Sequence, residues 1–310
     1  MFKLPDELMF IKNGSAKQKR STESMQGKLC VVSGATSGVG YEVVKQLAAG
    51  GADIVMVVRN ENKAQALKDE LVRDFQVMVD YFIADFSDLN QVKEAAQAIL
   101  NKYSKIDVLI NSAGIHSTKK VLNQEKVEMV FCVNHLAPFL LTRLLLSRII
   151  ASSPSRIIQV NSEGHRFNGL DVNDINWQKR IYTGLRSYGA SKTAQLYTVW
   201  KLAEHLKDTN VTINAVHPGG VKTNIGSNNG KLYRWFLHNV TWHFLKDPKI
   251  AGEAIYYLAS AKEVEKVSGK FFNLTIMEKP AKHALDKQTE EIIWDLSNKM
   301  IRWDENSYEI

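Results

Sequence analysis

One stretch decides the fold of this chain: Leu29-Cys30-Val31-Val32-Ser33-Gly34-Ala35-Thr36-Ser37-Gly38-Val39-Gly40. Its first five residues predict a buried strand, and the amphipathic segment that opens at Gly38 predicts a helix. Glycines allow backbone conformations and close approaches that a Cβ atom would block, so the turn can place a helix N-terminus against a pyrophosphate. A tight turn without a ligand is the alternative. The residues predicted to contact a cofactor here are Ser33, Gly34, Thr36, Ser37, Gly38, Val39 and Gly40.

Beyond this turn, short β-branched runs alternate with longer amphipathic segments. The alternation is typical of repeated strand–helix units and of a parallel sheet. Strands are predicted at 29–33, 54–58, 77–83, 108–110, 156–160, 211–216 and 270–274. Helices are predicted at 38–49, 63–74, 89–103, 134–150, 188–206 and 249–259. We therefore expect an α/β fold: a single-domain doubly wound (Rossmann) seven-stranded parallel sheet with helices on both faces.

The chain of 310 residues is longer than a typical domain of about 150, but a doubly wound sheet can extend over about 250 residues or more. We expect an N-terminal extension over 1–26 and one domain over 27–277. Residues 278–310 predict a tail helix whose apolar face docks on the body or on a second subunit. That face comprises Ile292, Ile293, Leu296 and Met300.

The net charge is +7, yet basic and acidic residues are interspersed over most of the chain. The densest basic run, 17–20, is interpreted as a solvated tail rather than a nucleic-acid or lipid contact, so no nucleic-acid partner is expected. Cys30 and Cys132 lie in apolar segments without metal-binding neighbours, which predicts reduced core thiols and no metal site. No uninterrupted apolar stretch approaches the roughly 20 residues of a membrane span, so a cytoplasmic location is expected.

The end of the second predicted strand carries Arg59, where a dinucleotide site usually carries an acidic side chain. A guanidinium cannot accept a hydrogen bond from a ribose hydroxyl, but it can hold a 2′-phosphate through two charge-assisted bonds. Arg59 therefore favours NADP(H) over NAD(H). A surface arginine is the alternative, and Glu61 is interpreted as a residue of the first helical turn.

Tyr188 and Lys192 lie four residues apart in a predicted helix, so their side chains share one face. A free tyrosine titrates near pH 10, and acid/base work near neutrality requires its pKa to fall by roughly 2 to 3 units. A nearby ammonium and a cationic nicotinamide both favour the phenolate. The pair predicts a proton donor and acceptor at Tyr188. A core tyrosine beside a solvated lysine is the alternative.

With the motif Tyr188-Gly189-Ala190-Ser191-Lys192, the sequence resembles the short-chain dehydrogenase/reductase family over roughly residues 27–277. Further motifs of the family follow in order: Asp85-Phe86, Asn111-Ser112-Ala113-Gly114, Asn134, Ser162 and His217-Pro218-Gly219. Segments 133–142, 217–223 and 267–272 resemble its retinol dehydrogenase-like branch. The resemblance implies a doubly wound fold, NADP(H), and alcohol, aldehyde or ketone substrates that are often lipophilic.

The resemblance also assigns roles to residues. It implies that Lys192 holds the nicotinamide ribose, Ser162 hydrogen-bonds the substrate oxygen, and Asn134 supports a water-linked proton path. The further cofactor contacts that it implies are Asp85, Phe86, Asn111, Ala113, Gly114, Tyr188, Pro218, Gly219, Val221 and Thr223. The sequence departs from the family pattern at Ser112, where asparagine is usual, and in a long loop between Ser162 and Tyr188.

Residues at about 224–247 lie between the sixth strand and the next helix, and residues 232–246 are rich in aromatic and apolar side chains. We interpret them as a lid over an apolar substrate. Core packing and peripheral insertion into a membrane are the alternatives.

The function predicted from the sequence is NADP(H)-dependent hydride transfer to or from a lipophilic, retinoid- or fatty-aldehyde-like alcohol or carbonyl compound. A non-catalytic NADP(H)-binding sensor or scaffold of the same fold is the alternative. His165 lies three residues after Ser162, but no nucleophile elbow accompanies it, so a hydrolase is not expected. A homo-oligomer is compatible with the sequence.

Overall fold

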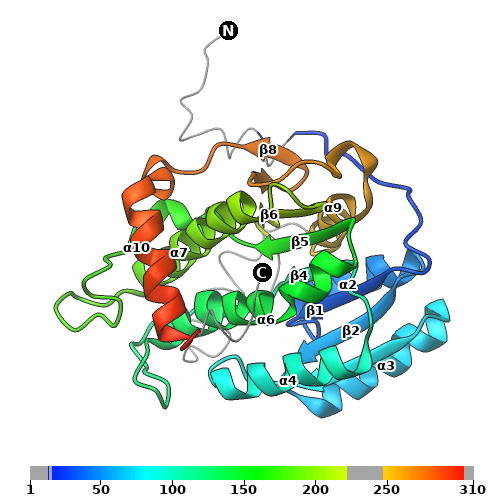
Figure 1. The fold of residues 1–310 in the computed structure, drawn as a ribbon, viewed down its shortest axis with the longest axis horizontal. Coiled ribbons are helices and arrows are strands. Elements are labelled where there is room, and N and C mark those ends of the chain that lie inside the picture. Colours follow the sequence, from blue (N-terminus) through cyan, green and yellow to red (C-terminus); the bar gives the residue numbers. More distant parts are fainter. Residues whose placement is uncertain (1–12, 14–15, 222–246, 304–310) are drawn as a thin grey trace, which may run out of the picture.

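The computed structural model describes residue 13 and residues 16–221 and 247–303. Its centre is an eight-stranded sheet in the order β3-β2-β1-β4-β5-β6-β7-β8 (Figure 1). The parallel strands are β1 (Leu29–Ser33), β2 (Asp53–Val58), β3 (Val79–Ile83), β4 (Val108–Asn111), β5 (Ser155–Val160), β6 (Val211–His217) and β7 (Phe271–Asn273). The predicted doubly wound α/β fold is confirmed.

The predicted strand count is wrong, because an eighth strand, β8 (Ile276–Glu278), pairs antiparallel with β7. The two strands form a tight hairpin in which Asn273 is opposite Ile276, and Leu274 turns the chain with a φ of +56°. The prediction also extended β7 through this turn residue. A three-residue edge strand is too short for its alternation to be recognised in the sequence.

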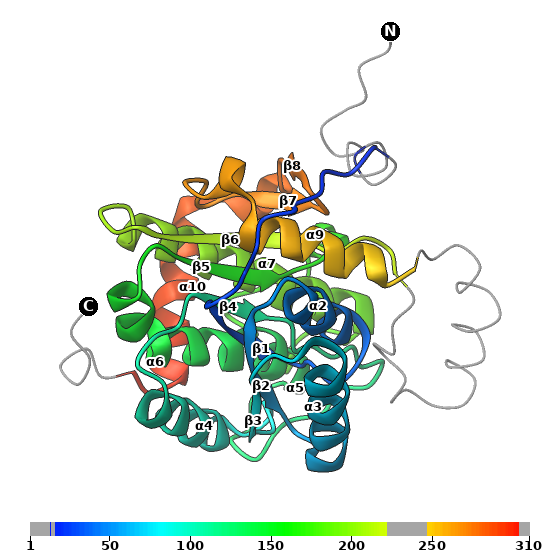
Figure 2. The same cartoon turned by 90° about the vertical axis from the view of Figure 1, so that its right-hand side faces the viewer.

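Helices cover both faces of the sheet, because successive residues of a strand point to opposite sides. On β1, Leu29 and Val31 pack into one apolar cluster, and Cys30 and Val32 pack into the other. The second cluster includes α2 (Gly38–Ala49), α3 (Glu61–Phe75) and α9 (Lys249–Ser260). The first includes α4 (Leu89–Lys102), α6 (Ala137–Ala151), α7 (Gly184–His205) and α10 (Lys287–Met300). Figure 2 shows α2 and α3 on one side of the sheet and α4 and α6 on the other.

The helix predicted at 134–150 is longer and less regular than expected. It begins with α5 (Met129–Phe131), continues as a π-helical turn (Cys132–Leu136) and becomes α6. Pro138 has no amide hydrogen, so it cannot donate to the carbonyl of Asn134 four residues earlier. That carbonyl accepts a hydrogen bond from Nε2 of Gln195 at 2.7 Å instead. The irregular turn therefore frees one backbone group for a contact with α7.

By length and composition, the helical stretch Met129–Ala151 is also apolar enough to cross a membrane. Most of it is buried between the sheet and its neighbouring helices, as in the core helix of many folds. It is weak evidence for a membrane span.

α7 begins four residues earlier than predicted. Oγ1 of Thr183 accepts a hydrogen bond from the amide of Arg186, which satisfies one of the free donors of the first turn. Tyr188 therefore lies in the second turn of α7 rather than at its first residue, as the predicted range of 188–206 implied. Among the described residues, the 3₁₀ helices are Glu163–Phe167, Lys262–Val264 and Lys282–Leu285.

The predicted tail helix is α10, which packs against α7 on the body of the same chain (Figure 1). Ile293 is fully buried, and Oγ of Ser297 lies 2.7 Å from Nε2 of His135. Ile292, assigned to the apolar face, is 40% exposed. The buried stripe is therefore narrower than the sequence indicated.

Candidate active site

Glycines let the turn after β1 close against the loop after β4. Gly34 has a φ of +68°, and a Cβ atom built on it would lie 2.7 Å from Cα of Ala113. A Cβ atom on Gly40 would lie 2.3 Å from the carbonyl oxygen of Gly34. Gly38 also has a positive φ, +58°. Because the neighbouring atoms belong to the backbone, they cannot move aside as a flexible side chain can, and the tight turn requires glycine.

The N-terminus of α2 opens directly from this turn. Ser37 precedes the helix in an extended conformation without a side-chain capping bond, and the first turn of α2 contains no acidic residue. Within this described segment, the first amides of the helix are left for another acceptor. The free amides lie at the positive end of the dipole of α2, and the glycines allow the backbone of the turn to come close to a ligand. Both properties fit a pyrophosphate. Thr36 and Val39 belong to the same turn and are partly buried.

The loop after β4 forms the opposite wall of the turn. Oγ of Ser33 accepts hydrogen bonds from the amides of Ser112 at 3.1 Å and Ala113 at 3.2 Å. The hydrogen bond from Ser112 to Ser33 uses the backbone amide of Ser112. Serine in place of the asparagine that is usual at this position therefore leaves this bond intact. Nδ2 of Asn111 donates to Oγ1 of Thr142 at 2.8 Å, which fixes the end of β4 against α6. Gly114 follows, and a Cβ atom there would lie 3.4 Å from Oδ1 of Asn134.

Tyr188 and Ser162 meet at the carboxyl edge of the sheet, where ligands bind in open α/β folds. The two side chains are hydrogen-bonded, and this bond lowers the pKa of Tyr188 by less than burial raises it. A Cβ atom on Gly164 would lie 2.6 Å from Cε1 of Tyr188, so the ring packs directly on the loop that carries Ser162. Oγ of Ser162 also accepts from the amide of Gly164 at 3.0 Å. The position of the serine hydroxyl therefore depends on the path of this loop.

Lys192 lies below Tyr188 on the same face of α7. Its ammonium is 5.7 Å from the centre of the Tyr188 ring and donates to the carbonyl oxygen of Val160 at 2.9 Å. Burial lowers the pKa of Lys192 to about 7. The expectation that the pKa of Tyr188 falls is wrong for the protein alone. Burial of the partly exposed Tyr188 side chain disfavours the phenolate. The Lys192 ammonium donates to the Val160 carbonyl rather than to the phenol, so it does not offset this effect.

Asn134 is fully buried in the π-helical turn and connects the loop after β4 with α7. Its Oδ1 accepts from the amide of Ile115 at 2.7 Å, and its Nδ2 donates to the carbonyl of Ile115 at 3.0 Å. Nδ2 also donates to Oγ of Ser191 at 3.1 Å. The side chain thus holds the two walls of the site together. Its role in a water-linked proton path stays a prediction.

Comparison with known proteins shows the family of this chain. The short-chain dehydrogenase family model matches residues 28–233. The chain belongs to the short-chain dehydrogenase family.

Among the curated relatives of this short-chain dehydrogenase, human retinol dehydrogenase 13 is 34% identical over 286 residues, covering 91% of this chain and 86% of the relative. Human retinol dehydrogenase 14 is 33% identical and covers 89% of this chain and 87% of that protein. Among solved structures, a blue fluorescent protein from a metagenomic library, in complex with NADPH, has a TM-score of 0.66 and 25% identity. It covers 81% of this chain and 98% of its own. The predicted resemblance is confirmed: this short-chain dehydrogenase is an oxidoreductase that uses a nicotinamide cofactor, NAD or NADP, on small-molecule alcohols or carbonyl compounds.

The residues predicted to read the adenosine half follow β2 and β3. Arg59 is exposed immediately after β2, with no ion pair to any residue that the structure describes. Oδ1 of Asp85 accepts from the amide and the hydroxyl of Ser87, at 2.9 Å and 2.8 Å, so this carboxylate already shapes its own turn. Phe86 is buried in the core. Glu61 is the first residue of α3, as expected.

The segment after β6 is described only in part. Pro218 and Gly219 follow His217 at the end of β6, and Gly219 has a φ of +84°. A Cβ atom on Gly219 would lie 3.2 Å from Cδ2 of Leu274, so the loop runs close to the β7–β8 hairpin. Val221 is buried. Thr223 and the interpreted lid at about 224–247 fall outside the described residues, except for residue 247.

Three further polar residues of the site were not predicted. Gln195 accepts from the Lys192 ammonium at 3.4 Å and from Nδ2 of Asn161 at 2.7 Å. The amide nitrogen of Asn161 also donates to the Lys192 carbonyl at 2.9 Å. His116 packs edge-on against the Tyr188 ring, with the ring centres 5.8 Å apart. Gln195 follows Lys192 by one helical turn, and that spacing was the available signal.

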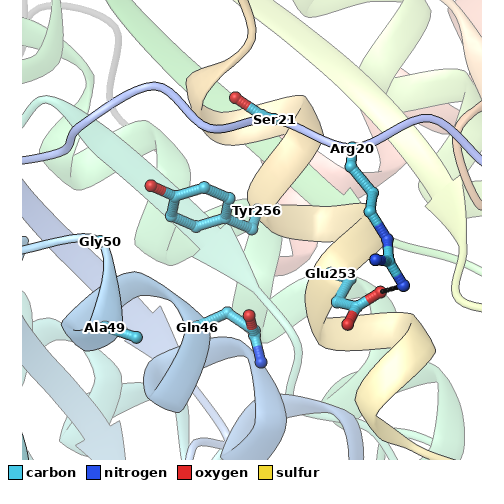
Figure 3. Close-up of a pocket in the computed structure, with 7 residues that line it drawn as sticks. All are labelled: Arg20, Ser21, Gln46, Ala49, Gly50, Glu253 and Tyr256. Carbon is cyan, nitrogen blue, oxygen red and sulfur yellow. Dashed lines mark ion pairs between the residues drawn. The ribbon is translucent and has the colours of Figure 1, made fainter.

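A polar groove lies apart from this site, at the far end of α2 (Figure 3). Arg20 and Glu253 form an ion pair at 3.3 Å across it, and the groove reaches Gly50 after the last residue of α2. With 12 residues at about 1.5 Å each, α2 separates this groove from the turn after β1 by about 18 Å. None of the predicted site residues lines it. Its lining residues are Arg20, Ser21, Gln46, Ala49, Gly50, Glu253 and Tyr256.

Proposed function

We propose that this protein is an NADP(H)-dependent oxidoreductase that transfers a hydride between the nicotinamide and a lipophilic alcohol, aldehyde or ketone. The observation that carries the proposal is the convergence of Tyr188 and Ser162 above the buried ammonium of Lys192. A phenol and a second hydroxyl, side by side at the carboxyl edge of the sheet, can both address one carbonyl oxygen. The bound nicotinamide supplies the hydride donor or acceptor.

In the proposed reduction, Ser162 holds the substrate oxygen by a hydrogen bond, and Tyr188 donates its proton to that oxygen as the carbon gains hydride. In the reverse direction Tyr188 accepts the proton from the alcohol. Lys192 supplies positive charge near the resulting phenolate and binds the nicotinamide ribose. Gln195 and the Val160 carbonyl orient the ammonium, since both lie within its hydrogen-bonding reach. General acid/base catalysis by one positioned side chain contributes about 10²- to 10⁴-fold.

Arg59 supports NADP(H) as the cofactor. It lies next to the end of β2, in the position where an acidic side chain would otherwise bind the ribose hydroxyls. An exposed guanidinium can hold a 2′-phosphate through two charge-assisted bonds. In this proposal, the backbone of the turn after β1 holds the pyrophosphate, and Arg59 holds the additional 2′-phosphate.

Two exposed side chains beside Tyr188 support a lipophilic substrate. Leu185, three residues before Tyr188 on α7, is 56% exposed, and Phe167 is 54% exposed. Cβ of Phe167 would lie 3.2 Å from a Cβ atom on Gly189, so it lies next to the same helix. Exposed apolar groups beside a binding site lose contact with water when an apolar ligand covers them. The names of the retinol dehydrogenase relatives point in the same direction.

We further propose a cytoplasmic location with peripheral membrane contact, and a homo-oligomer. Cell fractionation and light scattering coupled to size-exclusion chromatography test these two proposals. Recovery only in detergent-extracted membranes, or a monomeric mass at all concentrations, would contradict them.

The function is tested by incubating the purified protein with NADPH or NADH and a panel of medium- and long-chain aldehydes and retinal. We expect oxidation of NADPH that is faster than oxidation of NADH and that increases with the apolar length of the substrate. Binding of NADPH without turnover of any compound in the panel would contradict the proposal.

A further inference from the structure

The imidazole of His165 forms a buried bridge between the loop that carries Ser162 and the segment after β8. Its Nε2 accepts a hydrogen bond from the amide of Ala281 at 3.0 Å, so the ring proton lies on Nδ1. Nδ1 donates to the carbonyl oxygen of Ser162 at 2.7 Å. The side chain is fully buried, and burial lowers the pKa of His165 to about 4. Near neutrality the ring is therefore uncharged and held in one tautomer.

The backbone of His165 also connects this loop to α7, the helix that carries Tyr188 and Lys192. Its carbonyl oxygen accepts from Oγ1 of Thr193 at 3.2 Å and lies 2.9 Å from Nε2 of His283. Thr193 directly follows Lys192 on α7. One residue thus connects Ser162, α7 and residues 281–283. The edge of the ring also packs on Phe271 of β7, with ring centres 4.9 Å apart.

A second set of contacts holds the same loop to β8. Arg166, the next residue, donates to Glu278 at 2.7 Å, and the Glu278 side chain is almost fully buried. Arg166 also pairs with Glu163 at 2.5 Å. The loop is therefore fixed at both ends of its 3₁₀ helix. The contacts of Arg166 do not reach Ser162, whereas the Ser162 carbonyl accepts from Nδ1 of His165 at 2.7 Å and from the backbone amide of His165 at 3.2 Å.

We propose that His165 is a positioning residue that sets the orientation of Ser162 relative to Tyr188. The Nδ1–H bond, the shorter of the two bonds that the Ser162 carbonyl accepts from His165, orients the peptide plane of Ser162. Gly164, which packs closely on the Tyr188 ring, transmits any shift of that loop to the gap between the two hydroxyls. The inference depends on the proposed function, because it assigns a role in aligning the two groups that address the substrate oxygen. Residues 281–283 are then part of the support of the site, although they lie more than 110 positions along the chain from Ser162.

The test compares His165→Phe, which keeps a ring but removes both hydrogen bonds, with Ser162→Ala and with the double variant. Misplacement by about 1 Å can cost about 10²-fold in rate, so we expect His165→Phe to lower kcat by about 10- to 100-fold with little change in the Kd for NADPH. In the Ser162→Ala background, the same substitution should change kcat by less than about threefold, since the group it positions is absent. Full multiplication of the two effects would overturn the proposal. The control is His205→Phe, which replaces an exposed histidine at the end of α7 whose ring packs on Trp294 of α10, and it should leave kcat unchanged.

Two amide variants separate positioning from a general loss of packing. The amide nitrogen of His165→Asn can replace the Nδ1 donor toward Ser162, whereas His165→Gln reaches the position of Nε2 and Ala281. We expect Asn to restore more of kcat than Gln, although neither should restore the melting temperature fully. Equal rescue by the two amides, or better rescue by Gln, would contradict the proposal. These variants also keep the test available if His165→Phe does not fold.

Amide hydrogen exchange measured by mass spectrometry gives a readout that does not require turnover. In a folded variant that lacks the Nδ1 donor, exchange in residues 162–167 should accelerate at least about tenfold relative to the rest of the protein. Unchanged exchange there would refute the proposed positioning. If the wild-type protein reduces no substrate, the proposed function fails, but this measurement still decides whether His165 holds the loop.

Discussion

Replacing Gly34 by alanine tests whether the turn after β1 must come as close to the opposite wall as the structure shows. The new Cβ atom would lie 2.7 Å from Cα and 2.8 Å from N of Ala113, and both are backbone atoms. Gly34 also has a φ of +68°. Alanine in a left-handed conformation costs about 1 to 2 kcal/mol, and overpacking a tight contact costs a further 1 to 3 kcal/mol or so. We expect the free energy of unfolding to fall by about 3 to 4 kcal/mol.

Gly27→Ala is the matched control, because Gly27 has a φ of +74° and no neighbouring atom within 4 Å of the position of the new Cβ atom. It carries the conformational cost alone and should lower the free energy of unfolding by about 1 to 2 kcal/mol. The difference between the two variants, about 2 kcal/mol, measures the close approach of the two backbones. Urea denaturation followed by tryptophan fluorescence gives both values.

The same pair of variants tests the phosphate-binding role. We expect Gly34→Ala to weaken NADPH binding at least about tenfold in a fluorescence titration, since the turn must open to accept the methyl group. Gly27→Ala should leave the affinity unchanged. Equal losses of stability in the two variants, or full NADPH affinity in Gly34→Ala, would refute the reasoning.

Further predictions concern charge. Arg59→Asp should shift the ratio of kcat/KM for NADPH and NADH toward NADH by at least about tenfold, and an unchanged ratio would show that another residue reads the phosphate. Gln195→Leu removes an acceptor from the Lys192 ammonium and so lowers the pKa of Lys192; the loss of activity with rising pH should then begin at lower pH, and an unshifted pH–rate profile would contradict this role. Acid should destabilise the fold, because burial lowers the pKa of one histidine to about 4 and of two others to about 3. The stability that each buried neutral ring contributes is complete above the pKa of about 6.5 that histidine has in the unfolded chain. As the pH falls from there toward the pKa in the folded protein, each ring loses about 1.4 kcal/mol of this stability per pH unit. These histidines are His135, His165 and His217. Urea midpoints that stay constant from pH 7 to pH 5 would contradict the burial of the neutral rings.

Much of the fold could be predicted because its signals are local. The run of buried residues at β1 and the glycines behind it indicate a strand, a turn and a helix without reference to the rest of the chain. The hairpin of β8 was missed, since three residues at an edge give no usable alternation. The early start of α7 depends on one capping hydroxyl, Thr183, which resembles any other loop threonine in the sequence.

The sequence predicts the residues that are proposed to carry the chemistry, but it does not predict the residues that support them. The resemblance and the four-residue spacing single out Tyr188 and Lys192, and the structure brings them together with Ser162. The hydrogen bond from the Ala281 amide to Nε2 of His165 joins positions 116 residues apart, and only the folded chain reveals such a contact. In the protein without cofactor, the pKa of Tyr188 lies above its ordinary value, because burial, which the sequence does not quantify, outweighs the hydrogen bond from Ser162.

The central claim is that the phenol of residue 188 transfers the proton that accompanies hydride transfer. Its most direct test is single-turnover oxidation of bound NADPH by a long-chain aldehyde in Tyr188→Phe and in the wild-type protein, with the NADPH Kd of both measured in parallel. We predict a rate lower by about 10²- to 10⁴-fold at unchanged NADPH affinity. A rate within about threefold of the wild-type value would contradict the claim.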